Sequence, residues 1–162
     1  MSTDRKRHYI YLAGNISEDQ RTYEWREEFT ELLSDEPLII IVNPCANAFN
    51  QAMRNGPKDG LKFTQEAKKR SQKILRAKDY QLIKMCSVVV ANLWLDTPKK
   101  PMVGTIQELV WCHDIFYIPV IGICNDVKNI YTQHPWIDEC CSAKVNTVKE
   151  AVQMVKDFFL DY

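Results

Sequence analysis

Residues 87–91 read SVVVA, and residues 38–42 read LIIIV. Unbroken apolar runs of this length are typical of strands that are covered on both faces, as in parallel sheets. Similar runs occupy residues 9–13 (YIYLA) and 118–124, and a weaker one lies near residues 144–145. The sequence therefore predicts five short strands.

Helical patterns lie between these strands. Apolar residues at helical spacing run from Trp25 to Leu33, and further helices are predicted from about Thr64 to Met85, from Thr105, and after Thr147. Strands that alternate with helices form a parallel sheet with helices on both faces. With right-handed crossovers, five such strands favour a flavodoxin-like α/β fold, a three-layer sandwich with strand order 2-1-3-4-5.

The length and composition narrow the class of protein. The chain has 162 residues, with 21 basic and 21 acidic residues, and we expect a single domain over residues 1–162. The formal net charge is therefore zero, which removes a bulk electrostatic attraction to nucleic acid polymers or anionic membranes. The longest apolar stretch, residues 115–124, is too short for the roughly 20 residues of a membrane span. The charged N-terminus shows no signal peptide, so we expect a cytoplasmic protein.

Six cysteines are present, and none forms a C-x-x-C pair. We interpret them as reduced, mostly buried thiols. A zinc site at Cys124, His134, Cys140 and Cys141 is the alternative, but this spacing matches no common zinc pattern. We therefore predict no metal and no cofactor.

In a sheet of order 2-1-3-4-5, ligands bind beyond the carboxyl ends of the strands, where strands 1 and 3 diverge. Here that crevice is predicted to contain Gly14 and Asn15 after the first strand, Asn92 after the third, and the start of the helix at Thr105. Functional residues should converge there.

Glu108 is the most informative carboxylate. Gly104 permits a tight turn before the helix, and Glu108 in its first turn could face the crevice as a nucleophile or base. The alternative is that the T-x-x-E motif of Thr105 and Glu108 is only a capping box. The same motif at Thr147 and Glu150 is interpreted as a cap.

Other residues keep two interpretations. Asp79 is either a solvated helix charge or a functional acid, and Tyr11 is either a core aromatic or a site residue. Ser17 begins an S-x-x-Q pattern that predicts a capping box at a helix start. Residues 58–78 are strongly basic, which indicates a solvated helix face or, alternatively, a phosphate-binding surface.

Taken together, these segments resemble the nucleoside 2-deoxyribosyltransferase family, which includes the 2′-deoxynucleoside 5′-phosphate N-hydrolases. The resemblance covers roughly residues 9–125. It rests on IYLAG at residues 10–14, Trp25-Arg26, Asn43-Pro44, Asp79 with Ile83, CSVVVAN at residues 86–92, and VGTIQEL at residues 103–109.

The resemblance implies cleavage or exchange of the N-glycosidic bond of a (deoxy)nucleoside or its monophosphate. It implies that Glu108 is the nucleophile, that Tyr11 orients it and that Asp79 contacts or protonates the base. Gly14, Asn15, Ser17, Asn92, Gly104 and Thr105 are the predicted substrate-binding residues. A carboxylate beneath the anomeric carbon suits an oxocarbenium-like transition state.

The resemblance also implies a homo-oligomer with active sites near subunit contacts. Residues 99–102 (KKPM) depart from the family, whose better-known members carry an additional aspartate shortly before the glycine; the nearest acid here is Asp96. A non-catalytic nucleotide-binding or sensing module on the same scaffold is the alternative function. In either case the expected partner is a small nucleoside or nucleotide.

Overall fold

The structure is a computed structural model that describes residues 6–17, 19–47, 50–51, 54, 65–97 and 99–160, with side chains of the long helix described from residue 71. The strands are β1 (His8–Gly14), β2 (Ile39–Val42), β3 (Val88–Asn92), β4 (Val120–Ile123) and β5 (Ala143–Val145). The helices are α1 (Arg21–Leu32), α3 (Gln65–Lys84), α4 (Val103–Val110), the π-helix η2 (Trp111–Phe116), α5 (Ile130–Gln133), α6 (Pro135–Glu139) and α7 (Val148–Phe159).

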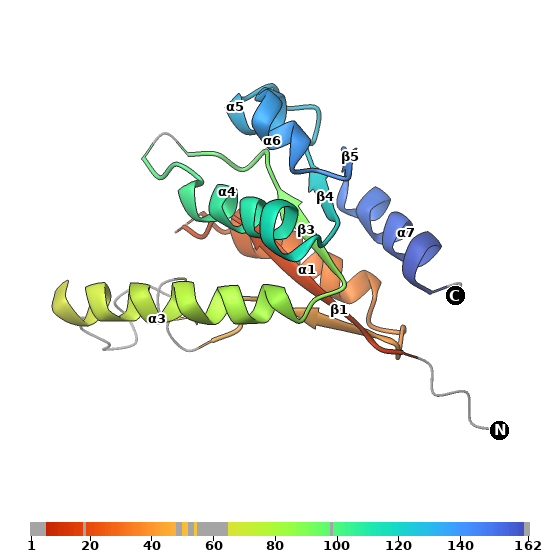
Figure 1. The fold of residues 1–162 in the computed structure, drawn as a ribbon, viewed down its shortest axis with the longest axis horizontal. Helices are drawn as coiled ribbons and strands as arrows, with labels where there is room; N and C mark the ends of the chain where they lie inside the picture. The colour runs from red at the N-terminus through yellow and green to blue at the C-terminus, as the bar shows by residue number, and fades with distance from the viewer. Residues whose placement is uncertain are drawn as a thin grey trace.

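The five strands form one parallel sheet in the order β2-β1-β3-β4-β5, which confirms the flavodoxin-like fold (Figure 1). β3 lies at the centre, and all five of its residues are buried. Its register with β1 pairs Tyr11 with Val89 and Gly14 with Asn92. The carboxyl ends of β1 and β3 therefore finish together, as the predicted crevice requires.

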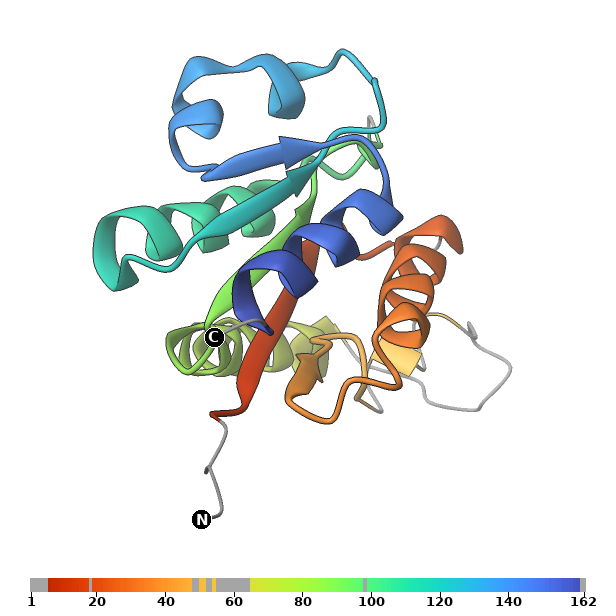
Figure 2. The ribbon, with the colours of Figure 1, turned by 90° about the vertical axis from the view of Figure 1, so that its right-hand side faces the viewer.

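Helices cover both faces of the sheet. On one face, α1 and α7 pack over side chains such as Ile10, Leu12 and Val90. Figure 2 looks onto α7 and shows α1 beside it. On the other face, α3, α4 and η2 pack over Tyr11, Ala13 and their neighbours. Alternate residues of β1 thus face opposite layers, and Tyr11 faces the layer that contains α3 and α4.

The helix starts test the predicted capping boxes. The box at α7 is confirmed, because Thr147 Oγ1 accepts from the Glu150 amide at 3.1 Å and the Glu150 carboxylate accepts from the Thr147 amide at 3.3 Å. The box at Ser17 is wrong. The helix begins four residues later, at Arg21, and the Ser17 hydroxyl instead accepts from the Asp19 amide at 3.2 Å.

Two aromatic side chains on the helices are exposed. Phe158 on α7 is 60% exposed, because the inner face of that helix is filled by Val148, Ala151, Val152 and Val155. His113 in η2 is exposed as well. The widened π-helical turn that begins at Trp111 changes which side chains point to the core.

No helix in the described part of the chain has the length and apolar character that crossing a bilayer requires. Of the strongly basic stretch at residues 58–78, the side chains before residue 71 lie outside the described residues, as does residue 64 at the predicted start of the long helix.

Candidate functional site

A groove of about 310 Å³ lies between α3 and α4, above the β1 side of the sheet. α3 contributes Gln72, Leu75, Arg76 and Asp79 to its walls; α4 and the first residue of η2 contribute Val103, Gly104, Gln107, Glu108 and Trp111. Residues three and four positions apart share one face of a helix, so each helix presents one continuous face to the groove. The volume is at the lower end of the range for small-molecule sites.

Tyr11, on β1 of the sheet, holds the side chain of Glu108 in place. The Tyr11 hydroxyl donates a hydrogen bond of 2.7 Å to Oε1 of Glu108. Burial raises the pKa of Glu108 to about 8, partly opposed by the Tyr11 hydrogen bond and by the charge of Arg26. Burial, together with the charges of Glu108 and Asp79, raises the pKa of Tyr11 well above its ordinary value. Tyr11 therefore remains a neutral hydrogen-bond donor to this carboxylate.

Asp79 lines the same groove from α3, the helix that connects β2 to β3. Its Oδ1 atom is buried, and no hydrogen-bond partner for it lies within the described part of the chain; Nζ of Lys78 is 3.7 Å away. Burial raises the pKa of Asp79, opposed mainly by Lys78. A half-buried acid with an elevated pKa and a free oxygen is suited to proton transfer to a bound group.

The capping alternative for Glu108 is wrong. α4 begins at Val103, with Met102 as its N-cap residue, so Glu108 lies in the second turn of the helix. Its carboxylate is directed to Tyr11 instead of to the backbone of Thr105. The two T-x-x-E motifs of the chain therefore have different structural roles, although they have the same pattern.

The predicted substrate-binding residues divide into two groups. Gly104 lines the groove, and a Cβ atom there would meet nothing within 4 Å. Thr105 is buried and is not part of the groove wall. Gly14, Asn15, Ser17 and Asn92 do not line the groove either, and each is buried or tightly packed at the ends of β1 and β3.

Hydrogen bonds explain why the asparagines belong to the scaffold. Asn15 Nδ2 donates to the carbonyls of Leu95 and Lys100, both at 3.4 Å. Asn92 Oδ1 accepts from the amides of Trp94 and Leu95, at 3.2 and 3.0 Å, which forms a turn directly after β3. These bonds fix the loop that leads from β3 to α4.

Gly14 has a φ of 152°, and a Cβ atom there would approach Asn92 Cβ to 3.2 Å and Arg26 Nη2 to 3.3 Å. The close approach of β1, β3 and α1 therefore requires a glycine at this position.

Arg26 is a residue that pattern analysis did not identify as functional. It is fully buried, and its guanidinium donates to the carbonyls of Gly14 at 2.9 Å and of Leu12 and Asn15 at 3.4 Å, and also to that of Thr22. Burial lowers its pKa, whereas the Glu108 charge raises it. Arg26 thus satisfies carbonyls at the carboxyl end of β1 and places a positive charge beneath the site. Its motif, Trp25-Arg26, was the only sequence signal.

Trp111 was also missed, and Arg76 was considered only as part of the basic stretch at residues 58–78. The Arg76 guanidinium lies 5.1 Å from the centre of the Trp111 ring, and Tyr80 contacts the same ring edge-on, with centroids 5.1 Å apart. Both partners come from α3, so the first residue of the π-helix is held against that helix. π-helical turns occur frequently at functional sites.

All six cysteines are unpaired thiols in the structure. In the described ranges, no group of three or more His, Cys, Asp or Glu side chains is arranged to hold a metal ion. Burial raises the pKa of Cys86, Cys112 and Cys141 to about 12, so these thiols are protonated at neutral pH.

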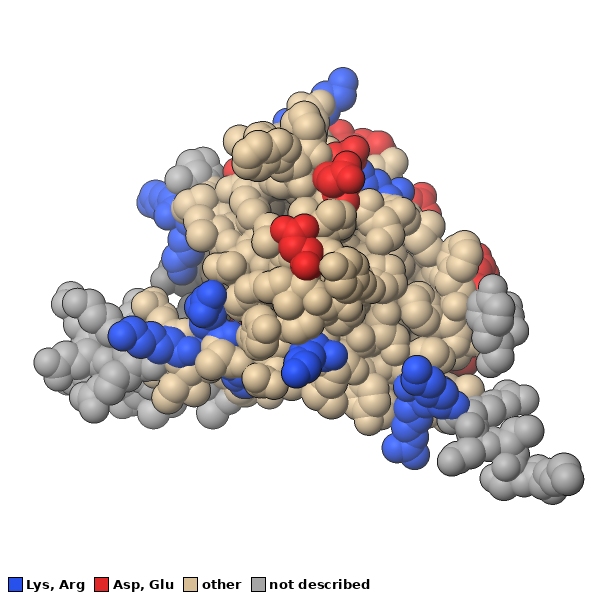
Figure 3. All heavy atoms as spheres, viewed as in Figure 1, with Lys and Arg blue, Asp and Glu red and all other residues tan. Residues whose placement is uncertain are grey.

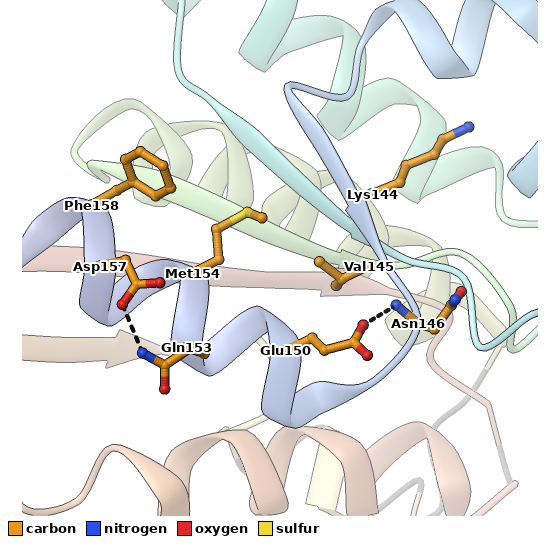
Figure 4. Close-up of a pocket in the computed structure, with 8 residues that line it drawn as sticks. All are labelled: Lys144, Val145, Asn146, Glu150, Gln153, Met154, Asp157 and Phe158. Atoms are coloured by element: carbon orange, nitrogen blue, oxygen red, sulfur yellow. Dashed lines mark hydrogen bonds between the residues drawn. The ribbon is translucent and has the colours of Figure 1, made fainter.

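A larger cavity of about 410 Å³ lies between β5 and α7 (Figure 4). None of the predicted site residues lines it. Its carboxylates already have partners, because Glu150 accepts from the Asn146 amide at 2.7 Å and Asp157 from Gln153 Nε2 at 2.7 Å. The groove between α3 and α4, where two carboxylates with elevated pKa values meet, is therefore the candidate site.

No protein-family model matches the chain, and no curated protein matches it in sequence. Solved structures share its fold. A conserved protein from Enterococcus faecalis has 15% identity and a TM-score of 0.64 over 93% of this chain and 98% of that one. A 2-deoxyribosyltransferase from Bacillus psychrosaccharolyticus has 14% identity and a TM-score of 0.60 over 89% and 90%. A CMP N-glycosidase from Clostridium botulinum has 15% identity and a TM-score of 0.51 over 93% and 99%.

Proposed function

We propose that this chain is an enzyme that cleaves or exchanges the N-glycosidic bond of a nucleoside or nucleotide. The observation that carries the proposal is the hydrogen bond from Tyr11 to Glu108 in a groove that also contains Asp79. The shared fold with a 2-deoxyribosyltransferase and a CMP N-glycosidase supports the same class of reaction. At 14% and 15% identity, that likeness supports the scaffold more than the site.

In the proposed first step, a Glu108 carboxylate oxygen attacks the anomeric carbon C1′. A C1′–O bond forms, the C1′–N bond breaks, and its electron pair goes to the base nitrogen. Asp79 gives its proton to the departing base. The Tyr11 hydrogen bond orients the Glu108 carboxylate for the attack.

In the second step, another base or a water molecule attacks C1′ of the glycosyl ester. Its proton goes to the Asp79 carboxylate, and Glu108 is released as a carboxylate. Two displacements on one carbon retain its configuration. A second base gives transfer, and water gives hydrolysis.

The protonation states required are an ionised Glu108 and a protonated Asp79. With a pKa of about 8 for Glu108, its ionised form is the minority at pH 7 and grows toward pH 8. Burial raises the pKa of Asp79, so its carboxyl holds a proton to a higher pH than a free aspartate does.

The test is release of free base from deoxynucleosides and their monophosphates, followed by reverse-phase chromatography with and without an acceptor base. Glu108→Ala should reduce turnover by at least about a thousandfold, because it removes the nucleophile. Glu150→Ala is the matched control, since Glu150 occupies the same sequence motif but only caps α7. Equal activity in the Glu108 variant and the wild type would refute the proposal.

Binding without turnover would instead favour the sensing module. In that case, nucleotides would raise the melting temperature of the wild type while no base is released at any pH between 6 and 9.

A further inference from the structure

The groove lies along a positively charged surface. In Figure 3, Lys and Arg side chains gather over the region where α3 runs in the matching view of Figure 1. The described side chains of α3, from residue 71 on, include the cations Lys73, Arg76, Lys78 and Lys84 and a single carboxylate, Asp79. A surface of this sign attracts anionic ligands and raises their local concentration.

Arg76 is the cation of this surface that enters the groove with its charge unpaired. It lines the groove together with Asp79 and Glu108. Within the described part of the chain, no carboxylate lies within ion-pair distance of its guanidinium. Lys78, by comparison, has Asp79 at 3.7 Å.

The contact of Arg76 with Trp111 leaves its donors available. The guanidinium lies 5.1 Å from the centre of the indole ring, and a cation–π contact uses its charge and none of its five N–H donors. Tyr80 contacts the same indole edge-on, so the ring that the guanidinium lies against is itself held by α3. A planar fork of donors matches the oxygens of a phosphate.

We propose that Arg76 binds the phosphate of the substrate, so that the groove selects nucleoside monophosphates over free nucleosides. This inference rests on the proposed function, because it names the substrate class of the same groove. Glu108 and Asp79 would act at the glycosidic bond, while Arg76, on the opposite wall from Glu108, would hold the anionic end of the same molecule. Arg76 is then a specificity-determining residue, separate from the reacting groups.

The competing explanation is that Arg76 only packs on Trp111. A packing role would affect nucleosides and nucleotides alike, because it would act through the shape of the groove. A phosphate-binding role changes the ratio of the two substrates. The informative quantity is therefore kcat/KM for a monophosphate divided by kcat/KM for the matching nucleoside.

The experiment compares the wild type with Arg76→Gln, Arg76→Lys and Lys73→Gln on a deoxynucleoside, its 5′-monophosphate and its 3′-monophosphate. Arg76→Gln should lower the monophosphate-to-nucleoside ratio by between about 10-fold and 100-fold, the range for loss of a charge-assisted hydrogen bond. Arg76→Lys should lower it less, because the charge remains but the fork is lost. Lys73→Gln removes the same charge from an exposed position outside the groove and should leave the ratio within about threefold.

A second measurement separates this inference from the proposed function. Thermal shifts of Glu108→Gln, with and without Arg76→Gln, report binding of intact substrate when no turnover occurs. A shift with the 5′-monophosphate that Arg76→Gln abolishes supports the phosphate site even if the wild type releases no base. Whichever monophosphate, 5′ or 3′, loses more binding identifies the phosphate that Arg76 contacts.

An unchanged ratio in Arg76→Gln, or an equal loss for nucleoside and monophosphate, would overturn the inference. If Arg76→Gln fails to fold, Arg76→Lys supplies the same comparison. A wild type that turns over neither substrate would refute the proposed function and leave the thermal shifts to decide the role of Arg76.

Discussion

The hydroxyl of Tyr11, on the central part of β1, donates to the carboxylate of Glu108, on α4, across 97 residues of sequence. The bond joins the sheet to the helix at the wall of the groove that contains Asp79. It fixes the orientation of one carboxylate oxygen of Glu108. β1, α3 and α4 thus contribute Tyr11, Asp79 and Glu108 to one site.

Tyr11→Phe should remove the hydrogen bond while keeping the buried ring. Because that bond lowers the pKa of Glu108, its loss should raise this pKa, so the limb of the pH profile of kcat/KM expected near pH 8 should move to higher pH. The rate at neutral pH should fall by about 10-fold to 100-fold, as for loss of a hydrogen bond to a charged group. Tyr9→Phe, two residues earlier on the same strand, is the control. A pH profile that does not move would contradict an orienting role for Tyr11.

Glu108→Gln should stabilise the protein, and the gain should grow with pH. The pKa of Glu108 is about 8 in the fold, against about 4.3 in an unfolded chain. Between these values the folded state keeps a proton that the unfolded state has lost, so wild-type stability falls by up to about 1.4 kcal/mol per pH unit. Glutamine does not titrate.

Melting curves of both proteins between pH 4.5 and 8.5 provide the measurement. The difference in stability should be small at the acid end, rise through the interval and level off above pH 8. Parallel curves would mean that Glu108 ionises normally in the fold.

Two glycines near the site should respond oppositely to alanine. Gly14→Ala should lower the free energy of unfolding by about 1–3 kcal/mol, because φ is 152° and the new Cβ would meet Asn92 and Arg26. Gly104→Ala should raise it by up to about 1 kcal/mol, since alanine favours helix and nothing lies within 4 Å. Denaturant unfolding of the two variants measures these free energies. A Gly14→Ala protein as stable as the wild type would argue against close packing at the end of β1.

The capping glutamate should affect stability alone. Glu150→Ala removes one half of the capping box of α7 and should cost about 1 kcal/mol without loss of turnover. Its partner change, Thr147→Ala, should cost about the same. Unfolding and base-release assays on these variants, set beside Glu108→Ala, test whether two identical motifs really have separate roles.

A homo-oligomer remains a prediction of the family resemblance. Two large aromatic side chains are used within the chain itself, because Trp111 is buried and Phe116 contacts Tyr80, with ring centroids 4.9 Å apart. Trp136, however, is 81% exposed on α6. Light scattering at micromolar concentration should give more than the 18.9 kDa of one chain. A Trp136→Ala variant tests whether this side chain lies in the contact, and a monodisperse active monomer would contradict the expectation.

The fold could be predicted from the apolar runs, because an unbroken apolar segment such as residues 87–91 is typical of a strand buried on both faces of a parallel sheet. Glu108, Asp79 and Tyr11 were grouped by the resemblance to a known family, and the strand order explains why their segments are neighbours in the fold. The place of Arg76 in the groove beside Trp111 could not be predicted in this way, because it depends on how α3 packs against η2. For Asn92, proximity to the crevice was correctly predicted, but its side chain is used by the turn after β3.

The 97-residue separation between Tyr11 and Glu108 also bears on how the chain acquires its activity. The pair can meet only after two crossover connections have closed around β3, and contacts of such long range are formed late and slowly in folding. No fragment that ends before α4 contains the acid, and none that begins after β1 contains its donor. During refolding from denaturant, helical signal should therefore recover before base release does, and the return of catalysis should coincide with completion of the sheet.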